Sequence, residues 1–347
     1  MAYEAKPNQV GVDNVRVNEA LTQLAFEYGD RKLIALTAFP RRQADGQTGL
    51  YPIFGEQHFR HETAYRGTTD KARRIHDTYS TDSFRCEDYA LDTFIPDKVV
   101  RNANDPAARL FLSKRRKVNF LKRTLMREHE IKFASLFAAG NFKTGLYNDG
   151  DAGTLGAAWA NWDDANQNGM QQIEEAMGIV EDEIGVRPDS ILMAQDLWSR
   201  IKYDTNLRGN SQTALMTREM FMELAEVDNF TVTGASYNSA KRGQTTVRTP
   251  IWGSNFLMLY FKGDVAPAGT DNEGLEDGSP TTAMTINFDM QEGMSNGELV
   301  REYRDNVAGG GGTVIEYAHC YDAKLTGKNP AGKIITAFRI DNAYSDL

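Results

Sequence analysis

A chain of 347 residues with a formal net charge of −9 and 41% hydrophobic residues has the profile of a globular protein, and its length predicts about two folding units. This composition excludes a disordered or fibrous chain, and the acidic balance argues against a dedicated nucleic-acid binder. The opening residues contain acidic side chains and no apolar core, and no run approaches the ~18 apolar residues of a membrane span, so we expect a soluble protein made in the cytoplasm.

The N-terminal part of the chain predicts an arm followed by a hairpin. Within residues 1–30, a few apolar residues recur at helical spacing in a polar segment, which indicates an arm with one helix that needs a neighbour to hold it. Between residues 33 and 53, short apolar runs alternate with turn residues, which predicts strands. Residues 55–96 carry many charges between flanks that favour β-structure, so we interpret them as a two-stranded hairpin with a charged tip near 66–74. With so little apolar surface, such a hairpin would be marginal alone in water.

A long helix is predicted next. Asp105 and Pro106 form a favourable start, with Asp as the cap and Pro at the first helical position, and no breaker occurs before Gly140, where we expect the helix to end. Such a helix would span about 50 Å, which is longer than one compact domain needs, so we interpret it as a spine. One side is expected to be apolar except at two positions: Val118, Leu121, Leu125, His129, Lys132 and Leu136. The other side is expected to hold basic residues: Arg115, Arg116, Lys122, Arg123 and Arg127.

The rest of the chain mixes helices and strands without repeating βα units, which predicts an α+β protein. Residues 141–168 are rich in Gly, Asn, Asp and Ala and are interpreted as a connector. Helices are expected at 170–184, around 197–201 and around 221–225, and strands at 190–193, 230–232 and 256–261. An acidic surface loop is expected at 266–280, and the segments 314–325 and 333–340 are expected to form paired strands.

No arrangement of residues predicts a catalytic, cofactor or metal site. The glycines of 140–145 have the spacing of half a phosphate loop, but Leu146 and Tyr147 stand where Lys and Ser or Thr would bind phosphate and magnesium. His58 and His61 lie three residues apart on a predicted strand, so they would face opposite sides of it. We therefore expect no enzyme activity, no cofactor and no metal.

The cysteines and the remaining histidines favour structural roles. Cys86 and Cys320 are far apart in sequence and match no zinc signature, so a reducing compartment without a structural disulfide is expected. His129 lies on the apolar stripe of the spine and is interpreted as a core residue. His319 and Cys320 are neighbours on a predicted strand and should point apart.

Taken in chain order, the polar arm, charged hairpin, spine helix, helix-and-strand region and final strands resemble the Hong Kong 97-like fold of tailed-phage major capsid proteins. STDSFRCEDYALDTFIPD, residues 80–97, looks like the family's strand returning from an extended loop. VRPDSILMAQDLWSRI, residues 186–201, looks like its strand followed by a helix bearing Trp. GASYNSAKRGQ at 234–244, followed by PIWGSNFLMLYF at 250–261, is the most distinctive match. The resemblance covers the chain from about residue 30 and includes no catalytic motif.

The resemblance implies both a domain layout and a function. The layout is an N-terminal arm at 1–45, an extended loop at 46–97, a peripheral domain with the spine helix at 98–144, an axial domain at 145–300, and strands at 301–347 that return to the peripheral domain. The function is that of a structural subunit, assembled in the host cytoplasm, that forms hexamers and pentamers and then the icosahedral virion shell around phage DNA.

The resemblance also implies partners and alternatives. Because the chain begins almost directly with the arm, a separate scaffolding protein is expected, together with a portal protein and, as a further candidate, a decoration protein. Packaged double-stranded DNA would make only weak, non-specific contact, and no membrane is involved. Some members of the family crosslink a loop lysine to an asparagine of a neighbour, but Lys71 with Asn342 or Asn329 is a loose match, so no crosslink is expected. An encapsulin-type nanocompartment is the alternative function, and a soluble hydrolase a lesser one.

The charges are distributed unevenly along the chain. Residues 101–150 hold eleven Lys or Arg against four Asp or Glu, whereas residues 151–200 hold two against ten, a pattern that suits contacts between copies. Two differently charged solvated faces remain an equal alternative. The candidate contact residues are four cations near the hairpin tip and three acids of the second helix: Arg66, Lys71, Arg73, Arg74, Glu174, Glu175 and Glu181. A tip that only keeps the protein soluble is the competing interpretation.

Overall fold

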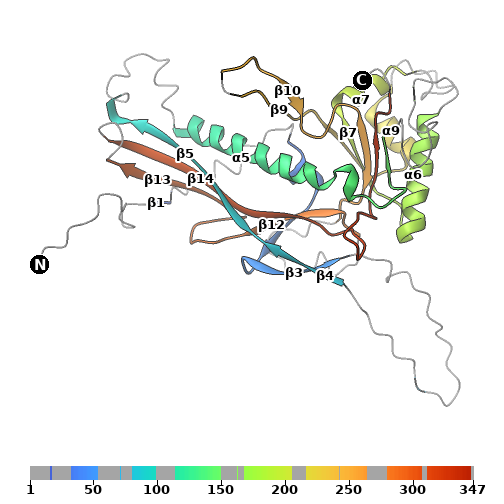
Figure 1. Cartoon of the computed structure of the whole chain (residues 1–347), viewed down its shortest axis with the longest axis horizontal. Helices are drawn as coiled ribbons and strands as arrows, with labels where there is room; N and C mark the ends of the chain where they lie inside the picture. The colour runs from blue at the N-terminus through green and yellow to red at the C-terminus, as the bar shows by residue number, and fades with distance from the viewer. Residues whose placement is uncertain are drawn as a thin grey trace, which may run out of the picture.

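In the computed structural model of the chain, the described residues are 16–17, 33–53, 71, 80–98, 114–149, 162, 168–204, 216–241, 243–263, 280–306 and 311–344. They form two layered parts joined by one long helix, α5 (Figure 1). Helices and sheets are mixed and no βα unit repeats along the described chain, which confirms the predicted α+β class.

A six-stranded sheet forms the first part, and β14 is its central element. The sheet order is β1-β13-β14-β12-β2, and β5 also pairs with β14. The strand bounds are β1 (Arg16–Val17), β2 (Arg41–Ala44), β5 (Glu87–Pro96), β12 (Ala283–Phe288), β13 (Glu298–Asp305) and β14 (Gly312–Leu325). Because β14 pairs along its length with β5, β12 and β13, all antiparallel, it connects segments that lie far apart in the sequence.

The two faces of this sheet are covered by different elements. On one face lies the spine helix α5 (Lys114–Leu136), and its apolar stripe packs on residues of β5, β13 and β14. The other face carries a second apolar cluster that includes Tyr51, Cys86 and Cys320. That cluster lies under a small two-stranded sheet made of β3 (Thr48–Ile53) and β4 (Ser80–Arg85), here called the β3–β4 limb.

The second part is a five-stranded sheet of order β6-β15-β11-β7-β8 covered by helices (Figure 1). Its strands are β6 (Tyr147–Asn148), β7 (Ser190–Ala194), β8 (Asn229–Thr233), β11 (Phe256–Tyr260) and β15 (Phe338–Asp341). Its helices are α6 (Gly169–Ile184), α7 (Gln195–Ile201) and α9 (Arg218–Ala225). Every residue of β7 and β11 is buried, as expected for the centre of a sheet covered on both faces.

Several elements agree with the sequence pattern. The stripe of apolar residues at 170–184 forms α6, whose N-cap Asn168 accepts hydrogen bonds from two backbone N–H groups and whose C-cap Gly185 adopts the left-handed conformation (φ 73°) that favours glycine. The segment 186–201 forms β7 and then α7, as predicted. The segment 234–250 forms a small hairpin, β9 (Ser236–Asn238) with β10 (Arg248–Pro250) (Figure 1).

The spine helix differs from its prediction in its end and in one face. It ends at Leu136 and not at Gly140, because the side-chain amide of Asn141 donates to the Leu136 carbonyl (2.9 Å) and a 3₁₀ turn follows at Ala139–Asn141. Its described part has 23 residues, or roughly 35 Å, and the predicted start at Asp105 lies outside the described residues. Lys122, predicted on the exposed basic side, is buried.

Three other predictions about the strands are wrong in part. Within 33–53, residues 35–38 form a short helix, α2 (Ala35–Ala38), and not a strand. Residues 87–96 do not return along a hairpin formed by 55–96: they form β5 and pair with β14, while the limb strand β4 pairs with β3. The segments 314–325 and 333–340 are not paired with each other, because β14 and β15 belong to different sheets. The hairpin tip and the acidic loop at 266–280 lie outside the described residues, except for Lys71 and Pro280.

Candidate functional site

The clearest features of the described part of the chain are the contacts that hold its elements together and the side chains that stay exposed. No group of three or more His, Cys, Asp or Glu side chains among the described residues is placed to hold a metal ion. Within the same residues, no helix is both long and apolar enough to cross a membrane. The informative features are therefore the contacts that fix the spine helix and the surfaces that stay exposed.

A buried ion pair fastens the middle of the spine to the sheet. The Lys122 ammonium lies 2.7 Å from the Glu298 carboxylate, and both side chains are less than a tenth exposed. The same carboxylate accepts a hydrogen bond from the Tyr317 hydroxyl (2.8 Å) and lies 3.7 Å from the Arg41 guanidinium. Burial, followed by the charge of Glu298, raises the pKa of Tyr317 well above its usual value. One carboxylate on β13 therefore connects α5, β14 and β2.

A second buried carboxylate holds three separate segments together. Glu130 of α5 accepts hydrogen bonds from the backbone N–H groups of Ile34 (3.1 Å) and Ala35 (2.8 Å), at the start of α2, and from the Trp252 indole (2.6 Å). Burial raises the pKa of Glu130, and these three donors oppose that rise. Glu130 thus fixes the end of the N-terminal segment and the loop before β11 onto the spine.

Two buried histidines lie between α5 and the sheet. His129 contacts the edge of the Tyr321 ring (centroids 4.5 Å apart), and His319 stacks on the same ring at 4.6 Å. Burial, followed by the neighbouring charge of His319, lowers the pKa of His129 well below its usual value. Burial, followed by the charge of Arg41, lowers the pKa of His319 to about 3. Both imidazoles are therefore uncharged at neutral pH, and His129 is the core histidine that was predicted.

Of the predicted cations at the hairpin tip, the structure describes Lys71, which is exposed. Arg66, Arg73 and Arg74 lie outside the described residues. A contact between the predicted basic tip and the predicted acids is therefore not tested by the described residues, and it stays a proposal.

The predicted acids Glu174, Glu175 and Glu181 all lie on the exposed face of α6. Glu174 is already ion-paired within the chain to Arg187, which also lies 3.7 Å from Glu226. Glu175 accepts a hydrogen bond from the Gln171 amide (3.0 Å). The pairing of Glu174 leaves Glu175 and Glu181 as the better candidates for contact with another subunit.

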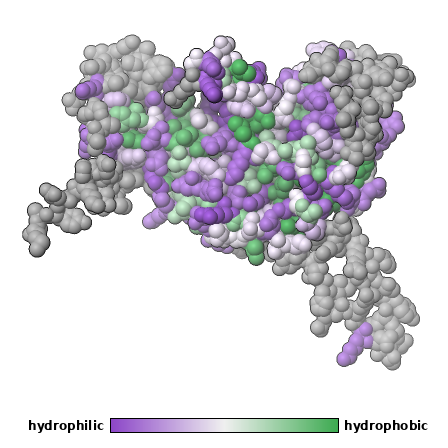
Figure 2. Space-filling model, viewed as in Figure 1, coloured by the Kyte–Doolittle hydropathy of each residue, from purple (hydrophilic) through white to green (hydrophobic). Residues whose placement is uncertain are grey.

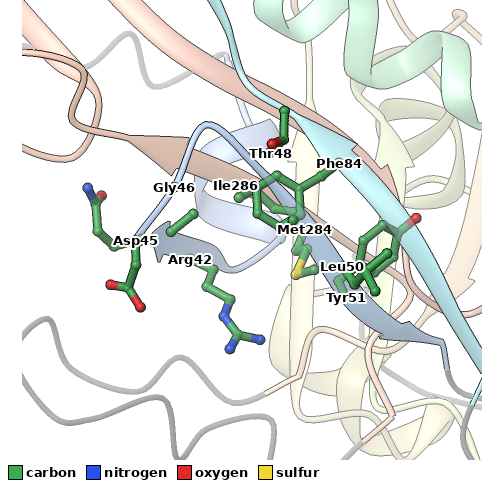
Figure 3. A pocket seen from close by; sticks show the side chains of 12 residues that line it. Arg42, Asp45, Gly46, Thr48, Leu50, Tyr51, Phe84, Met284 and Ile286 are labelled. Atoms are coloured by element: carbon green, nitrogen blue, oxygen red, sulfur yellow. The ribbon is translucent and has the colours of Figure 1, made fainter.

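A pocket of about 230 Å³ opens at the base of the β3–β4 limb. Tyr51, Phe84 and two side chains of β12, Met284 and Ile286, form an apolar wall, while polar residues of the β2–β3 turn stand at its rim (Figure 3). The neighbouring Leu50 is 70% exposed. The limb therefore presents one large apolar side chain to solvent beside this pocket.

Other exposed apolar side chains are scattered. Phe120 on the spine is 63% exposed, and Val247 beside the β9–β10 hairpin is 53% exposed. Figure 2 shows hydrophobic residues on this face in small separate areas among hydrophilic ones. Scattered residues of this kind are ordinary on a protein surface, so they mark no single binding patch.

The roles of Glu130, Lys122 and Glu298 were not predicted from the sequence. A signal for two of them was present: Val118, Lys122, Met126 and Glu130 follow one another at intervals of four, and so form a second row beside the apolar stripe. Charged residues inside a wide buried stripe predict buried partners, but the identity of the partners depends on tertiary contacts.

Comparisons with known proteins agree with this architecture. The sequence is 22% identical over 249 residues to the major capsid protein of Burkholderia phage BcepMu, covering 70% of this chain and 76% of that protein. The structure is similar to that of a phage-related protein from Bordetella bronchiseptica, with a TM-score of 0.66 and 22% identity over 94% of this chain and 97% of the other. A virus-like particle from Pyrococcus furiosus matches with a TM-score of 0.50 and 8% identity over 93% of this chain and 96% of the other. No protein-family model matches the chain.

The order of elements and these likenesses show the fold: the chain has the Hong Kong 97-like fold, as the resemblance implied. The curated protein to which its sequence is similar is a phage major capsid protein.

Proposed function

We propose that the chain is the major capsid protein of a bacteriophage, a structural subunit that assembles with copies of itself into an icosahedral shell around double-stranded DNA. The observation that carries the proposal is the combination of a capsid fold over nearly the whole chain with sequence similarity to a phage major capsid protein. The role is structural, and no residue is assigned to catalysis.

The buried contacts of Glu298 and Glu130 suit a subunit that assembles into a shell. One sequence in a shell must occupy non-equivalent positions, which requires a stiff centre and adaptable limbs. The spine helix supplies the stiff centre, because Glu298 and Glu130 fasten it to both parts of the fold. Its C-terminal end also packs, through Phe133 and Phe137, into the core of the part that contains the five-stranded sheet. The β3–β4 limb is our candidate for an adaptable element, since its two strands pair only with each other among the described strands, although Tyr51 and Arg85 hydrogen-bond to Leu325 and Asp322 of β14.

We further propose the domain layout and partners that the resemblance implies. In this layout, residues 1–45 are the arm, 46–97 the extended loop, 98–144 and 301–347 the peripheral domain, and 145–300 the axial domain. The sheets do not follow these bounds everywhere, because β5, β12 and β13 share a sheet with β14, whereas β15 lies in the other sheet. Subunits form hexamers and pentamers in the host cytoplasm with a separate scaffolding protein, a portal protein occupies one vertex, and a decoration protein is a further candidate partner. The net charge of −9 limits adhesion of the packaged DNA to the shell, because non-specific binding depends on clustered cations.

The test is to express the protein with and without the scaffolding protein of the same phage and to observe the products by electron microscopy. Rings, tubes or closed shells support the proposal, and a protein that stays monomeric under all conditions contradicts it. Shells that enclose a protein cargo in place of DNA would favour the encapsulin-type alternative, and hydrolysis of phosphoesters or glycosides would favour the hydrolase.

Reversal of charge by mutation tests the proposed contact between the hairpin tip and the acidic residues of α6. The double change Arg73→Glu with Arg74→Glu should lower the yield of shells while the melting of the unassembled protein stays unchanged. Exposed ion pairs contribute only about 0.2–1 kcal/mol each, but a shell repeats them in every subunit. Adding Glu175→Lys and Glu181→Lys to the same chain should restore part of the yield if these acids are the partners. An undiminished yield across a salt series would remove the tip from assembly.

A further inference from the structure

Cys86 lies at the joint between the β3–β4 limb and the six-stranded sheet. The residue follows β4, which ends at Arg85, precedes β5, which begins at Glu87, and belongs to neither strand. Its backbone N–H donates to the carbonyl of Gln47, just before β3 (2.8 Å). A covalent bond at Cys86 would therefore fix the limb relative to the sheet.

Cys320 of β14 lies beside Cys86. Asp88 of β5 is the direct partner of Cys320, and Cys86 precedes Asp88 by two residues, so both cysteines are on the same face of the sheet as diagonal neighbours. Both cysteines are completely buried and belong to one apolar cluster. The two thiols interact with each other, and both are free.

The pocket at the base of the limb is walled by residues that also surround this buried pair, although neither cysteine lines it. Tyr51, Phe84, Met284 and Ile286 line the pocket and also belong to, or pack on, the cluster that contains the two cysteines (Figure 3). The Cys86 thiol donates to the backbone carbonyl of Ile286 (3.5 Å). At about 230 Å³, the pocket has room for a small oxidant, since a water molecule occupies about 30 Å³ in the liquid.

We propose that Cys86 and Cys320 form a disulfide on oxidation and that this bond locks the β3–β4 limb to β14. With hydrogen peroxide as the oxidant, the Cys86 thiolate attacks one peroxide oxygen, the O–O bond breaks, and the departing hydroxide takes up the thiol's proton to give water. Cys86 is then a sulfenic acid. The Cys320 sulfur attacks the Cys86 sulfur, the S–O bond breaks, and the hydroxyl leaves with the Cys320 proton as a second water. Two thiols lose two electrons, which reduce one peroxide to two waters.

The order of the two steps follows from the environment of each thiol. The interaction between the two thiols lowers the pKa of the Cys86 thiol and raises that of Cys320. Cys86 is therefore the attacking thiolate and Cys320 the resolving group. In a reducing cytoplasm the pair stays reduced and only non-covalent contacts hold the limb to β14, whereas an oxidising medium closes the bond. The inference concerns the subunit itself and does not depend on the proposed function.

The test uses the full-length protein, reduced and then treated with hydrogen peroxide. Because the chain has two cysteines, an intramolecular disulfide can join only Cys86 to Cys320. After denaturation and alkylation, we expect the treated chain to have lost both reactive thiols, to weigh two hydrogens less, and to run as a monomer on a non-reducing gel. The melting temperature should rise by a few degrees, because the bond restricts the unfolded chain, and a reductant should reverse every change.

The variant Cys320→Ser provides the control. It keeps the attacking thiol but lacks the resolving one, so peroxide should leave a sulfenic acid on Cys86 that dimedone labels. Two thiols that still alkylate after treatment, separate oxidation of both cysteines to sulfinic acids, or a disulfide between two chains would each overturn the proposal. If the serine variant does not fold, the measurements on the unchanged protein decide alone.

Discussion

Replacing His319 by phenylalanine should make the subunit less sensitive to acid. The His319 ring stacks on Tyr321, and neither ring nitrogen has a hydrogen-bond partner among the described residues, so phenylalanine keeps the packing and removes no bond. Because burial, together with the charges of Arg41 and Lys122, lowers the pKa of His319 to about 3, the unfolded chain binds a proton near pH 6.5 and the folded chain does not. Above pH 6.5, His319 therefore causes no loss in the free energy of unfolding. Below pH 6.5, that free energy decreases as the pH falls towards 3.

The magnitude follows from that gap in pKa. At pH 5, protonation of His319 in the unfolded chain lowers the free energy of unfolding by about 2 kcal/mol, whereas at pH 7.5 it lowers it hardly at all. Urea denaturation of the unassembled protein should therefore show His319→Phe gaining about 2 kcal/mol over the parent when the pH changes from 7.5 to 5. Tyr321→Phe is the matched control, because it alters a neighbouring buried ring without changing any group that titrates in this range. A difference between variant and parent that stays constant with pH would refute the reasoning.

Three further predictions concern the spine and the covalent state of the shell. Leu121→Ala and Leu125→Ala should each lower the free energy of unfolding by about 2–5 kcal/mol, because both side chains are buried against the sheet. Lys122→Met should cost about 3–5 kcal/mol in the same urea assay, because the buried carboxylate of Glu298 loses its closest cation, and adding Glu298→Gln should recover part of that loss. Finally, mature particles boiled in detergent should run as one band near 38.8 kDa, because Lys71 with Asn342 or Asn329 only loosely matches the crosslinking pair of the resembling family.

For each of these three predictions, one result would contradict it. If both leucine variants melt within a degree of the parent, the buried face of α5 is assigned wrongly. A double variant that loses as much as Lys122→Met and Glu298→Gln added together would show that the two groups do not interact. A ladder of multimers in boiled particles would reveal covalent crosslinking and implicate Lys71.

The sequence alone determined the elements whose formation depends on local chemistry. The helix α6 follows from the spacing of its apolar residues, an Asn cap and a closing glycine, and all of these lie within one segment. The middle of α5 and the strands β7, β11 and β14 follow from short-range patterns in the same way. The order of these elements along the chain was enough for the resemblance to a capsid fold, because that order is a property of the sequence.

The tertiary structure decided how distant segments meet. Residues 35–38 have no strong helical pattern, and the carboxylate of Glu130, nearly a hundred positions away, accepts the N–H groups that start α2. The segment 87–96 favours a strand, but only the presence of β14 makes it part of the large sheet and not of a hairpin. From the sequence, Lys122 is interpreted as a surface cation, and only the structure shows its buried partner Glu298. Likewise, Cys86 and Cys320 come close together only because β5 pairs with β14. Pairing of this kind depends on contacts across more than 90 residues of chain, and local propensities and spacing carry no information about it.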